Sequence, residues 1–362
     1  MKTTRSIALG IVGLGLGLLV AGPLLPGGER VSRIDLPSAG HVTDLAPGGN
    51  GSVLAGTQDG EIWRLIEGQW GRVAMDLGGQ PVTALTAEPV GTPTQGPIGT
   101  AAGLVNPPPG MPPLTMRISD EVATDDGLVV GSGEGLWVQG TGSWQQALPD
   151  VNVYRLERQA SDGASFVHAG TVGDGVYSAS DAALLDWLPN RDGLPDGANV
   201  FSFALTPAGR LLAGTDRGLY WQDAPFQPWQ SLKTGLEKSR ALSLLLAPDT
   251  QANHNAAGAH PLWIGSDKGL YRVDLAEDAD GVEALAYASR IEPPPHHVRF
   301  GISWILPYDD GILFSAGSVY RYGPAGFPGW YWISFAGVLL ILLGGWLFPG
   351  RATDGTSREA SA

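Results

Sequence analysis

The sequence contains no cysteine, which excludes disulfide bonds, thiol catalysis and cysteine-ligated metal sites. Charged residues are also scarce, at 16% of the chain, and acidic ones outnumber basic ones, so the formal net charge is −14. A nucleic-acid-binding protein needs a basic face to displace counterions from phosphates, so this balance argues against a nucleic-acid partner. For a domain exported from the cytoplasm, an acidic surface contributes solubility.

One short pattern recurs along the chain: an apolar run, a Gly-Thr or Gly-Ser pair, two variable residues, a glycine, and an apolar-aromatic pair. The glycine that opens this pattern is found at six positions: Gly56, Gly99, Gly131, Gly170, Gly214 and Gly265. The apolar runs predict short strands, and the residues between them predict a tight turn with Gly218 or Gly269 at positive φ. The copies recur about every 40 residues, which is the spacing of four-stranded propeller blades.

Three departures from the repeat carry further predictions. The stretch Gln251–His260 lengthens one repeat and predicts a surface loop. The proline-rich stretch Asn106–Pro113 predicts that the second blade lacks its outer strand, because proline removes ladder donors. A degenerate seventh copy, Ile312–Tyr320, has Ser315 in the place of the glycine.

The repeats divide into an all-β, seven-bladed propeller, with six to eight blades as the range. The expected inner strands begin at Val42, Val82, Ile118, Val153, Val200, Ala241 and Val298. Tryptophans near the outer strands are expected to pack between blades: Trp70, Trp144, Trp187 and Trp229. The last blade runs out of chain, and Arg30–Leu36 alternates apolar and polar residues, so we expect this N-terminal segment to supply its outer strand.

Two apolar spans flank the repeats. The first, Ile7–Leu25, is a signal peptide or a signal anchor, and the absence of a good small-x-small site around Ala21 favours an uncleaved anchor. Gly13 and Gly17 have the spacing that lets membrane helices approach closely, against the alternative that they are incidental. The second span, Trp330–Phe348, has aromatic residues at both ends.

The spans set the expected domains and location. The boundaries are 1–28 for the N-terminal segment, 29–326 for the propeller, 327–349 for a transmembrane helix and 350–362 for a short cytoplasmic tail. Lys2, Arg5 and Arg351 place both ends in the cytoplasm by the positive-inside rule, whereas Arg30 and Arg33 argue against it. The propeller is therefore expected on the extracytoplasmic side of a cytoplasmic membrane, and the spans side by side.

At Gly214–Tyr220, preceded by Asp192–Val200, the sequence resembles the propeller repeats of bacterial sensor ectodomains of the two-component-regulator type. It is also similar to BNR-like propellers, which include sortilin-type domains and photosystem II assembly factors. The resemblance covers residues 41–322 and implies architecture, because these families bind different things. The chain departs from them in two ways: it has no Asp box, and no kinase or other output domain follows the second span.

Seven residues precede the expected inner strands: His41, Pro81, Arg117, Asn152, Asn199, Arg240 and His297. Inner strands line the central channel, so the six polar residues of this set could ring its mouth. Two are arginines, whose guanidinium forks suit an anionic group. The alternative is that positions at a loop edge are polar in any case.

No cofactor or metal site is expected. Adjacent side chains such as those of His296 and His297 diverge on a strand, His254 and His260 lack zinc spacing, and His168 is expected in the core or between blades. The pairs Asp125-Asp126 and Asp309-Asp310 are expected in turns, and Glu277–Asp280 in a solvated loop with a faint chance of Ca²⁺. No pair of carboxylates stands out as a glycosidase pair.

The resulting functional prediction is a membrane-tethered propeller that binds a partner or ligand and acts as an assembly scaffold at the outer face of the membrane. Its partner would be a membrane protein or complex, with an anionic small ligand as a further candidate. Two alternatives stay open. One is a sensory ectodomain that signals through a partner membrane protein, and the other is a carbohydrate-active hydrolase or lyase on a BNR-like frame.

Overall fold

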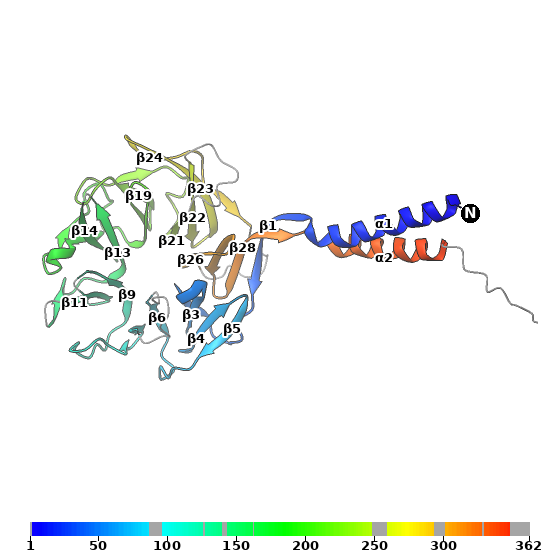
Figure 1. Ribbon diagram of the computed structural model, residues 1–362. Helices are drawn as coiled ribbons and strands as arrows, with labels where there is room; N and C mark the ends of the chain where they lie inside the picture. Colours follow the sequence, from blue (N-terminus) through cyan, green and yellow to red (C-terminus); the bar gives the residue numbers. More distant parts are fainter. Residues whose placement is uncertain are drawn as a thin grey trace, which may run out of the picture. The chain divides into compact units, whose positions relative to one another are not determined.

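The computed structural model describes residues 2–86, 96–125, 127–139, 143–161, 163–247, 259–292, 301–327 and 329–347. The chain forms two compact units, one of Val31–Tyr322 and one in which Met1–Arg30 joins Gly323–Ala362. The larger unit is a ring of small sheets (Figure 1). The smaller unit contains two helices, α1 (Lys2–Leu24) and α2 (Trp330–Leu347).

The described residues form seven sheets, each of which is one blade, so the predicted seven-bladed propeller is confirmed. Blade 1 consists of β2 (Val42–Pro47), β3 (Val53–Thr57), β4 (Ile62–Ile66) and β5 (Gln69–Val73). Blade 2 consists of β6 (Val82–Leu85), β7 (Ile98–Thr100) and β8 (Gly103–Val105). Blade 3 consists of β9 (Ile118–Ala123), β10 (Leu128–Ser132), β11 (Gly135–Gln139) and β12 (Trp144–Ala147). Blades 4 and 5 are β13 (Val153–Ser161), β14 (Ala164–Thr171), β15 (Val176–Ser180) and β16 (Leu188–Pro189); and β17 (Val200–Leu205), β18 (Leu211–Thr215), β19 (Gly218–Gln222) and β20 (Gln230–Leu232).

Blades 6 and 7 complete the ring. Blade 6 is β21 (Ala241–Leu246), β22 (Ala259–Ser266), β23 (Gly269–Asp278), β24 (Gly281–Ala284) and β25 (Ser289–Ile291), and blade 7 is β26 (Trp304–Tyr308), β27 (Gly311–Ser315), β28 (Val319–Gly326) and β1 (Pro26–Ile34). Short 3₁₀ turns, η1 (Gly49–Gly51) and η2 (Asp181–Ala183), lie in blades 1 and 4. The inner strands contact one another in chain order, and β26 returns to β2.

The seventh blade takes its outer strand from the other end of the chain, as predicted. Its strand order is β1-β28-β27-β26, and the Ser32 hydroxyl donates to the Arg321 carbonyl oxygen at 3.5 Å. The ring therefore closes on a strand from the N-terminal part of the chain, which completes blade 7 as a four-stranded sheet.

The first glycine of the repeat marks the contact between one blade and the next. A Cβ on Gly56 would lie 2.4 Å from Val82 Cγ1, and one on Gly131 would lie 2.9 Å from Val153 Cγ1. In both cases the neighbour is the first residue of the next inner strand. In blades 1 to 6 the register between the two innermost strands also shifts at the second residue of the inner strand, which is a repeated bulge.

The rest of the repeat builds the turn between the second and third strands. The Thr215 hydroxyl donates to the Gly218 carbonyl oxygen at 2.9 Å and accepts from the Arg217 amide at 3.0 Å. Gly218 has φ +92° and Gly269 has φ +137°, as predicted. In blade 7, Ser315 pairs with Trp304, the register that the glycine has elsewhere, so it does take the glycine's place.

The structure confirms most of the predicted strand positions and corrects the assignment of His260. Blade 2 has three strands among the described residues, as its proline-rich stretch predicted. The expected inner-strand starts of blades 1 to 6 are all confirmed. Val298 lies outside the described residues, and β26 begins at Trp304, with Ile302 packed against Gly265 in the usual place. Residues 251–258 of the expected surface loop also lie outside the described residues, but His260 belongs to β22, which corrects its assignment to a loop.

His168 joins blades 4 and 5, as expected. Its side chain is fully buried, and its ring nitrogens contact Ser178 Oγ at 2.7 Å and Gln159 Oε1 at 2.8 Å. Gln159 in turn donates to the Gly209 carbonyl oxygen of blade 5 at 2.6 Å. Burial lowers the pKa of His168 to about 3, so this histidine is a neutral structural group.

The tryptophans near the outer strands also pack between blades. Trp229 is buried and donates to the Asn190 carbonyl oxygen, in the connection from blade 4, at 2.8 Å. Trp70 packs in a cluster with Leu313 and Val319 of blade 7.

In the smaller unit, α1 and α2 pack closely and both are long and apolar enough to cross a membrane. A Cβ on Gly15 would lie 2.6 Å from the Gly337 carbonyl oxygen, and one on Gly22 would lie 2.9 Å from the Trp330 carbonyl oxygen. Gly13 and Gly17 are incidental to this packing, which was one of the two alternatives from the sequence, because nothing lies within 4 Å of a Cβ on either of them. Gly15 and Gly22, which are seven residues apart, face the partner helix, whereas Gly13 and Gly17, which are four residues apart, do not.

Candidate functional site

A cavity of about 470 Å³ opens where inner strands begin. It is lined by residues of blades 1 to 4 and 7: His41, Val42, Thr43, Gln58, Pro81, Val82, Thr83, Ala101, Arg117, Ser119, Tyr154, Arg155, Gly301, Ser303, Trp304, Ser315 and Gly317. We call it the channel cavity. The described lining includes two cationic residues, an exposed and a largely buried arginine, together with a histidine, although the whole chain carries a net charge of −14.

The structure brings together part of the predicted ring. His41, Pro81 and Arg117 all line the channel cavity, and the first and third are exposed. No salt bridge to the Arg117 side chain occurs in the part of the chain that the structure describes.

The other described members of the predicted ring, Asn152, Asn199 and Arg240, are not lining residues of this cavity. Asn199 is held by the turn beside it, with its amide nitrogens 3.0 and 3.1 Å from the Asp216 carboxylate. The Asn152 carbonyl oxygen accepts from the Val172 amide, and Arg240 donates its backbone amide to Asp267 at 3.2 Å. His297 lies outside the described residues.

Sequence reasoning missed the residues deeper in the cavity. Arg155 is in β13 and Trp304 is in β26, at the equivalent register of their blades. The guanidinium carbon of Arg155 lies 3.9 Å from the centroid of the Trp304 ring, a cation–π contact between blades 4 and 7. Trp304 is itself fixed by donation from Nε1 to the Thr43 carbonyl oxygen at 3.1 Å.

Four carboxyl groups lie near Arg155 and behind the lining. Asp44 and Asp120 occupy its register in blades 1 and 3, and each accepts a backbone amide of the next blade, Leu85 N at 2.5 Å and Leu156 N at 2.8 Å. Burial raises the pKa values of both carboxyls. These aspartates join neighbouring inner strands, so they hold the ring around the cavity together.

The other two are glutamates. Burial raises their pKa values into the neutral range, to about 8 for Glu121 and about 7 for Glu157. Thr86 Oγ1 lies within hydrogen-bonding distance of both Glu121 Oε1 and the Pro97 carbonyl oxygen. Because a hydroxyl has one proton, both contacts are hydrogen bonds only when Glu121 is protonated and donates to Thr86. The geometry and the pKa shift therefore agree on a neutral Glu121 at pH 7.

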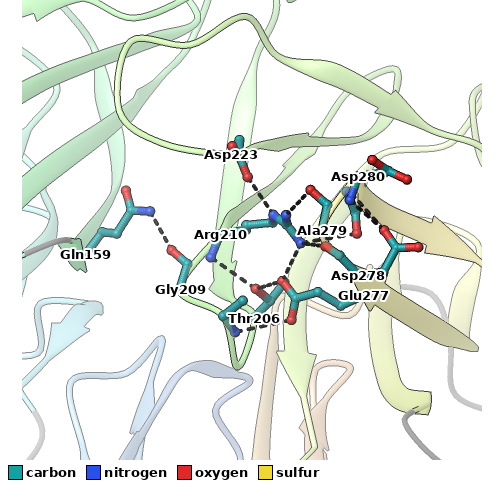
Figure 2. Close-up of polar contacts among 11 residues, drawn as sticks. Gln159, Thr206, Gly209, Arg210, Asp223, Glu277, Asp278, Ala279 and Asp280 are labelled. Atoms are coloured by element: carbon teal, nitrogen blue, oxygen red, sulfur yellow. Dashed lines mark hydrogen bonds and ion pairs between the residues drawn. The ribbon is translucent and has the colours of Figure 1, made fainter.

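Arg210 is the centre of another group of polar contacts (Figure 2), and it is not a lining residue of the channel cavity. Arg210, at the start of β18, donates to the carboxylates of Asp223 at 2.7 Å and Glu277 at 3.3 Å. It also donates to the carbonyl oxygens of Asp278, Ala279 and Gly281 at 2.7, 3.5 and 3.2 Å. Glu277 and Asp278 end β23 rather than lying in a loop, but Asp278–Asp280 are exposed to solvent as expected. The Arg210 guanidinium contacts this segment through the Glu277 carboxylate and backbone carbonyl oxygens.

The described residues contain no cluster of three or more His, Asp or Glu side chains arranged to hold a metal ion. None of the lining residues that the structure describes carries a carboxylate. The lining thus offers donors, hydroxyls and aromatic faces, rather than the acid and base pair of a glycosidase.

No family model matches the chain, and no curated protein matches its sequence. Solved structures do match. The extracellular domain of a putative hybrid two-component system from B. thetaiotaomicron is 16% identical with a TM-score of 0.56, over 82% of this chain and 42% of that one. An ancestral GH74 enzyme is 17% identical with a TM-score of 0.58, over 81% of this chain and 46% of that one.

A third structure, YCF48 bound to a D1 peptide, is 12% identical with a TM-score of 0.54, over 83% of this chain and 99% of that one. This chain thus spans less than half the length of the sensor ectodomain and of the GH74 enzyme. At these identities the likeness shows the propeller fold alone.

Proposed function

We propose that this chain is a membrane-anchored, extracytoplasmic β-propeller that binds a protein partner as an assembly scaffold, with the mouth of the channel cavity as its binding surface. The observation that carries the proposal is the charge of that surface. Arg117 and Arg155 supply the charged groups of the described lining, with His41 beside them, in a chain with an excess of acidic residues. Such a local reversal of charge attracts an acidic partner segment and orients its approach.

The two terminal helices support the anchoring part of the proposal. Each is long and apolar enough to cross a membrane, and their close packing gives an antiparallel pair. Such a pair leaves both chain ends on one side of the membrane. The basic residues Lys2, Arg5 and Arg351 favour the cytoplasmic side for those ends, so the propeller faces outward.

The test is a cross-linked pulldown of the full-length protein from its own membranes in a gentle detergent. We expect a stoichiometric membrane protein or complex with the wild type, and its loss with Arg117→Ala. The matched control is Arg240→Ala, an exposed arginine that also precedes an inner strand but does not line the cavity. A wild-type protein that elutes alone would contradict the scaffold, and equal loss with both variants would contradict the cavity as the binding surface.

A further inference from the structure

Two arginines of this protein are buried to a similar degree but differ in their hydrogen bonds. The Arg210 side chain is 10% exposed and donates to five acceptors (Figure 2). The Arg155 side chain is 14% exposed, and its one hydrogen bond in the described residues is Nε to the Phe201 carbonyl oxygen at 3.5 Å. A guanidinium has five N–H donors, and leaving them unpaired out of water costs free energy.

The carboxylate nearest to Arg155 forms a long ion pair with it and uses few of these donors. Asp120 Oδ2 lies 3.6 Å from Arg155 Nη1, which is longer than a hydrogen bond. Each of its oxygens accepts one backbone amide, Oδ2 from Leu156 at 2.8 Å and Oδ1 from Glu121 at 2.9 Å. The Nη groups of Arg155, which lines the cavity, therefore stay available to an acceptor inside it.

Further polar groups face the same space. Thr83 lines the cavity, and its hydroxyl is buried without a hydrogen-bond partner within the described ranges. Ser119 and Ser303 add hydroxyls to the lining. Arg117 lies at the mouth, directly before β9, the strand that contains Ser119. The donors are thus arranged at two depths, with one cation at each.

We propose that the channel cavity is a binding site for an anionic group, a carboxylate or a phosphoryl group, which accepts hydrogen bonds from Arg155 and Thr83 inside and is attracted by Arg117 at the mouth. The proposal rests on the proposed function, because it names the chemistry of the partner segment that enters the cavity. Stacking on Trp304 fixes the Arg155 guanidinium before the anion arrives, so little side-chain order is lost on binding.

The experiment uses the full-length protein in neutral detergent micelles and two probes. Trifluoroacetate, followed by fluorine NMR line width, represents a carboxylate, and inorganic phosphate, followed by phosphorus NMR, represents a phosphoryl group. We expect saturable binding of at least one probe. Its affinity should fall about tenfold in Arg117→Ala, the loss of roughly one partly screened charge pair, and should not change in Arg240→Ala. The probe that binds more tightly identifies the class of the anion.

Arg155→Met should abolish binding, and thermal unfolding reports whether that variant stays folded. If it does not fold, the comparison of Arg117→Ala with Arg240→Ala decides alone. Absence of saturable binding of both probes, or equal affinity in these two variants, overturns the anion site. If the pulldown still recovers a partner in that case, the scaffold stands and only the anion site is lost.

Discussion

The missing side chain of Gly56 leaves room for Val82, because a Cβ on that glycine would lie 2.4 Å from the valine Cγ1. We predict that Gly56→Ala destabilises the propeller by about 1–3 kcal/mol, since the neighbouring inner strand would have to shift. Gly71→Ala is the matched control: Gly71 lies in β5, and nothing is within 4 Å of an added Cβ. Thermal unfolding of both variants is the measurement, and equal melting temperatures would refute the role given to the repeat glycine.

The raised pKa of Glu121 predicts a pH-dependent stability. The unfolded chain loses this proton near pH 4.5 and the folded protein near pH 8. Between these values the folded state holds a proton that the unfolded state has released. The contribution of Glu121 is therefore fully present below about pH 4.5, declines as the pH rises, and is lost above about pH 8.

Glu121→Gln should remove this term, because glutamine cannot ionise and its amide can still donate to Thr86. We expect the variant to gain melting temperature relative to the wild type as the pH is raised from 5 to 9, by several degrees. Glu134→Gln, at an exposed position, serves as the control. A difference between Glu121→Gln and the wild type that is constant across this pH range would argue against a neutral Glu121.

Arg210 fastens the hairpin of β23 and β24 onto blade 5. Arg210→Met keeps the aliphatic stem but leaves the buried Glu277 carboxylate without its cation, and breaking such a pair costs about 3 kcal/mol. We expect faster amide hydrogen exchange at the end of β23 and in β24, with exchange in blade 1 unchanged. Arg217→Met, which alters an arginine with a 47% exposed side chain, should leave exchange in the hairpin as it is. Similar amide protection of the β23–β24 hairpin in both variants would show that Arg210 does not hold the hairpin on blade 5.

The helix pair allows a comparison within one helix. Gly15→Leu places a large side chain against the Gly337 carbonyl oxygen and should separate α1 from α2. Gly13→Leu points its side chain into open space and should leave the pair intact. Because the chain has no native cysteine, a spin label at one engineered cysteine in each helix can report the separation by electron paramagnetic resonance. The packing described for Gly15 is wrong if both variants give the wild-type distance.

The blades were predictable because their signal is local and repeated. Turn geometry fixes Gly218 and the Thr215 hydroxyl within a few residues, so six copies reveal the same sheet. The strand exchange at blade 7 was also predictable, since an alternating segment at one end matched a missing strand at the other.

The site was only partly predictable, for two physical reasons. The inner strand of blade 7 was expected to begin at Val298, whereas Ile302 takes the equivalent place against Gly265, so Trp304 was not aligned with Asp44 and Arg155. Whether a polar residue faces the cavity also depends on the blade that carries it, because the described lining comes from blades 1 to 4 and 7. Arg117 and Arg240 look alike in sequence, but only Arg117 lines the cavity. The sequence signal that could have found Arg155 is its position two residues into an inner strand, where a lone cation replaces the aspartate of blades 1 and 3.

The pairing of β1 with β28 also governs when this protein can become complete. Ser32 and Arg321 are separated by 289 positions along the chain. A ribosome releases β1 first, and the partner of that strand follows only after blades 1 to 6 have been synthesised. During synthesis and export, blades 1 to 6 can form in succession, whereas the first strand must wait unpaired until the end. A chaperone that assists folding of this protein would therefore need to keep β1 from pairing elsewhere. Pairing of β1 with β28 is then the step that completes the ring.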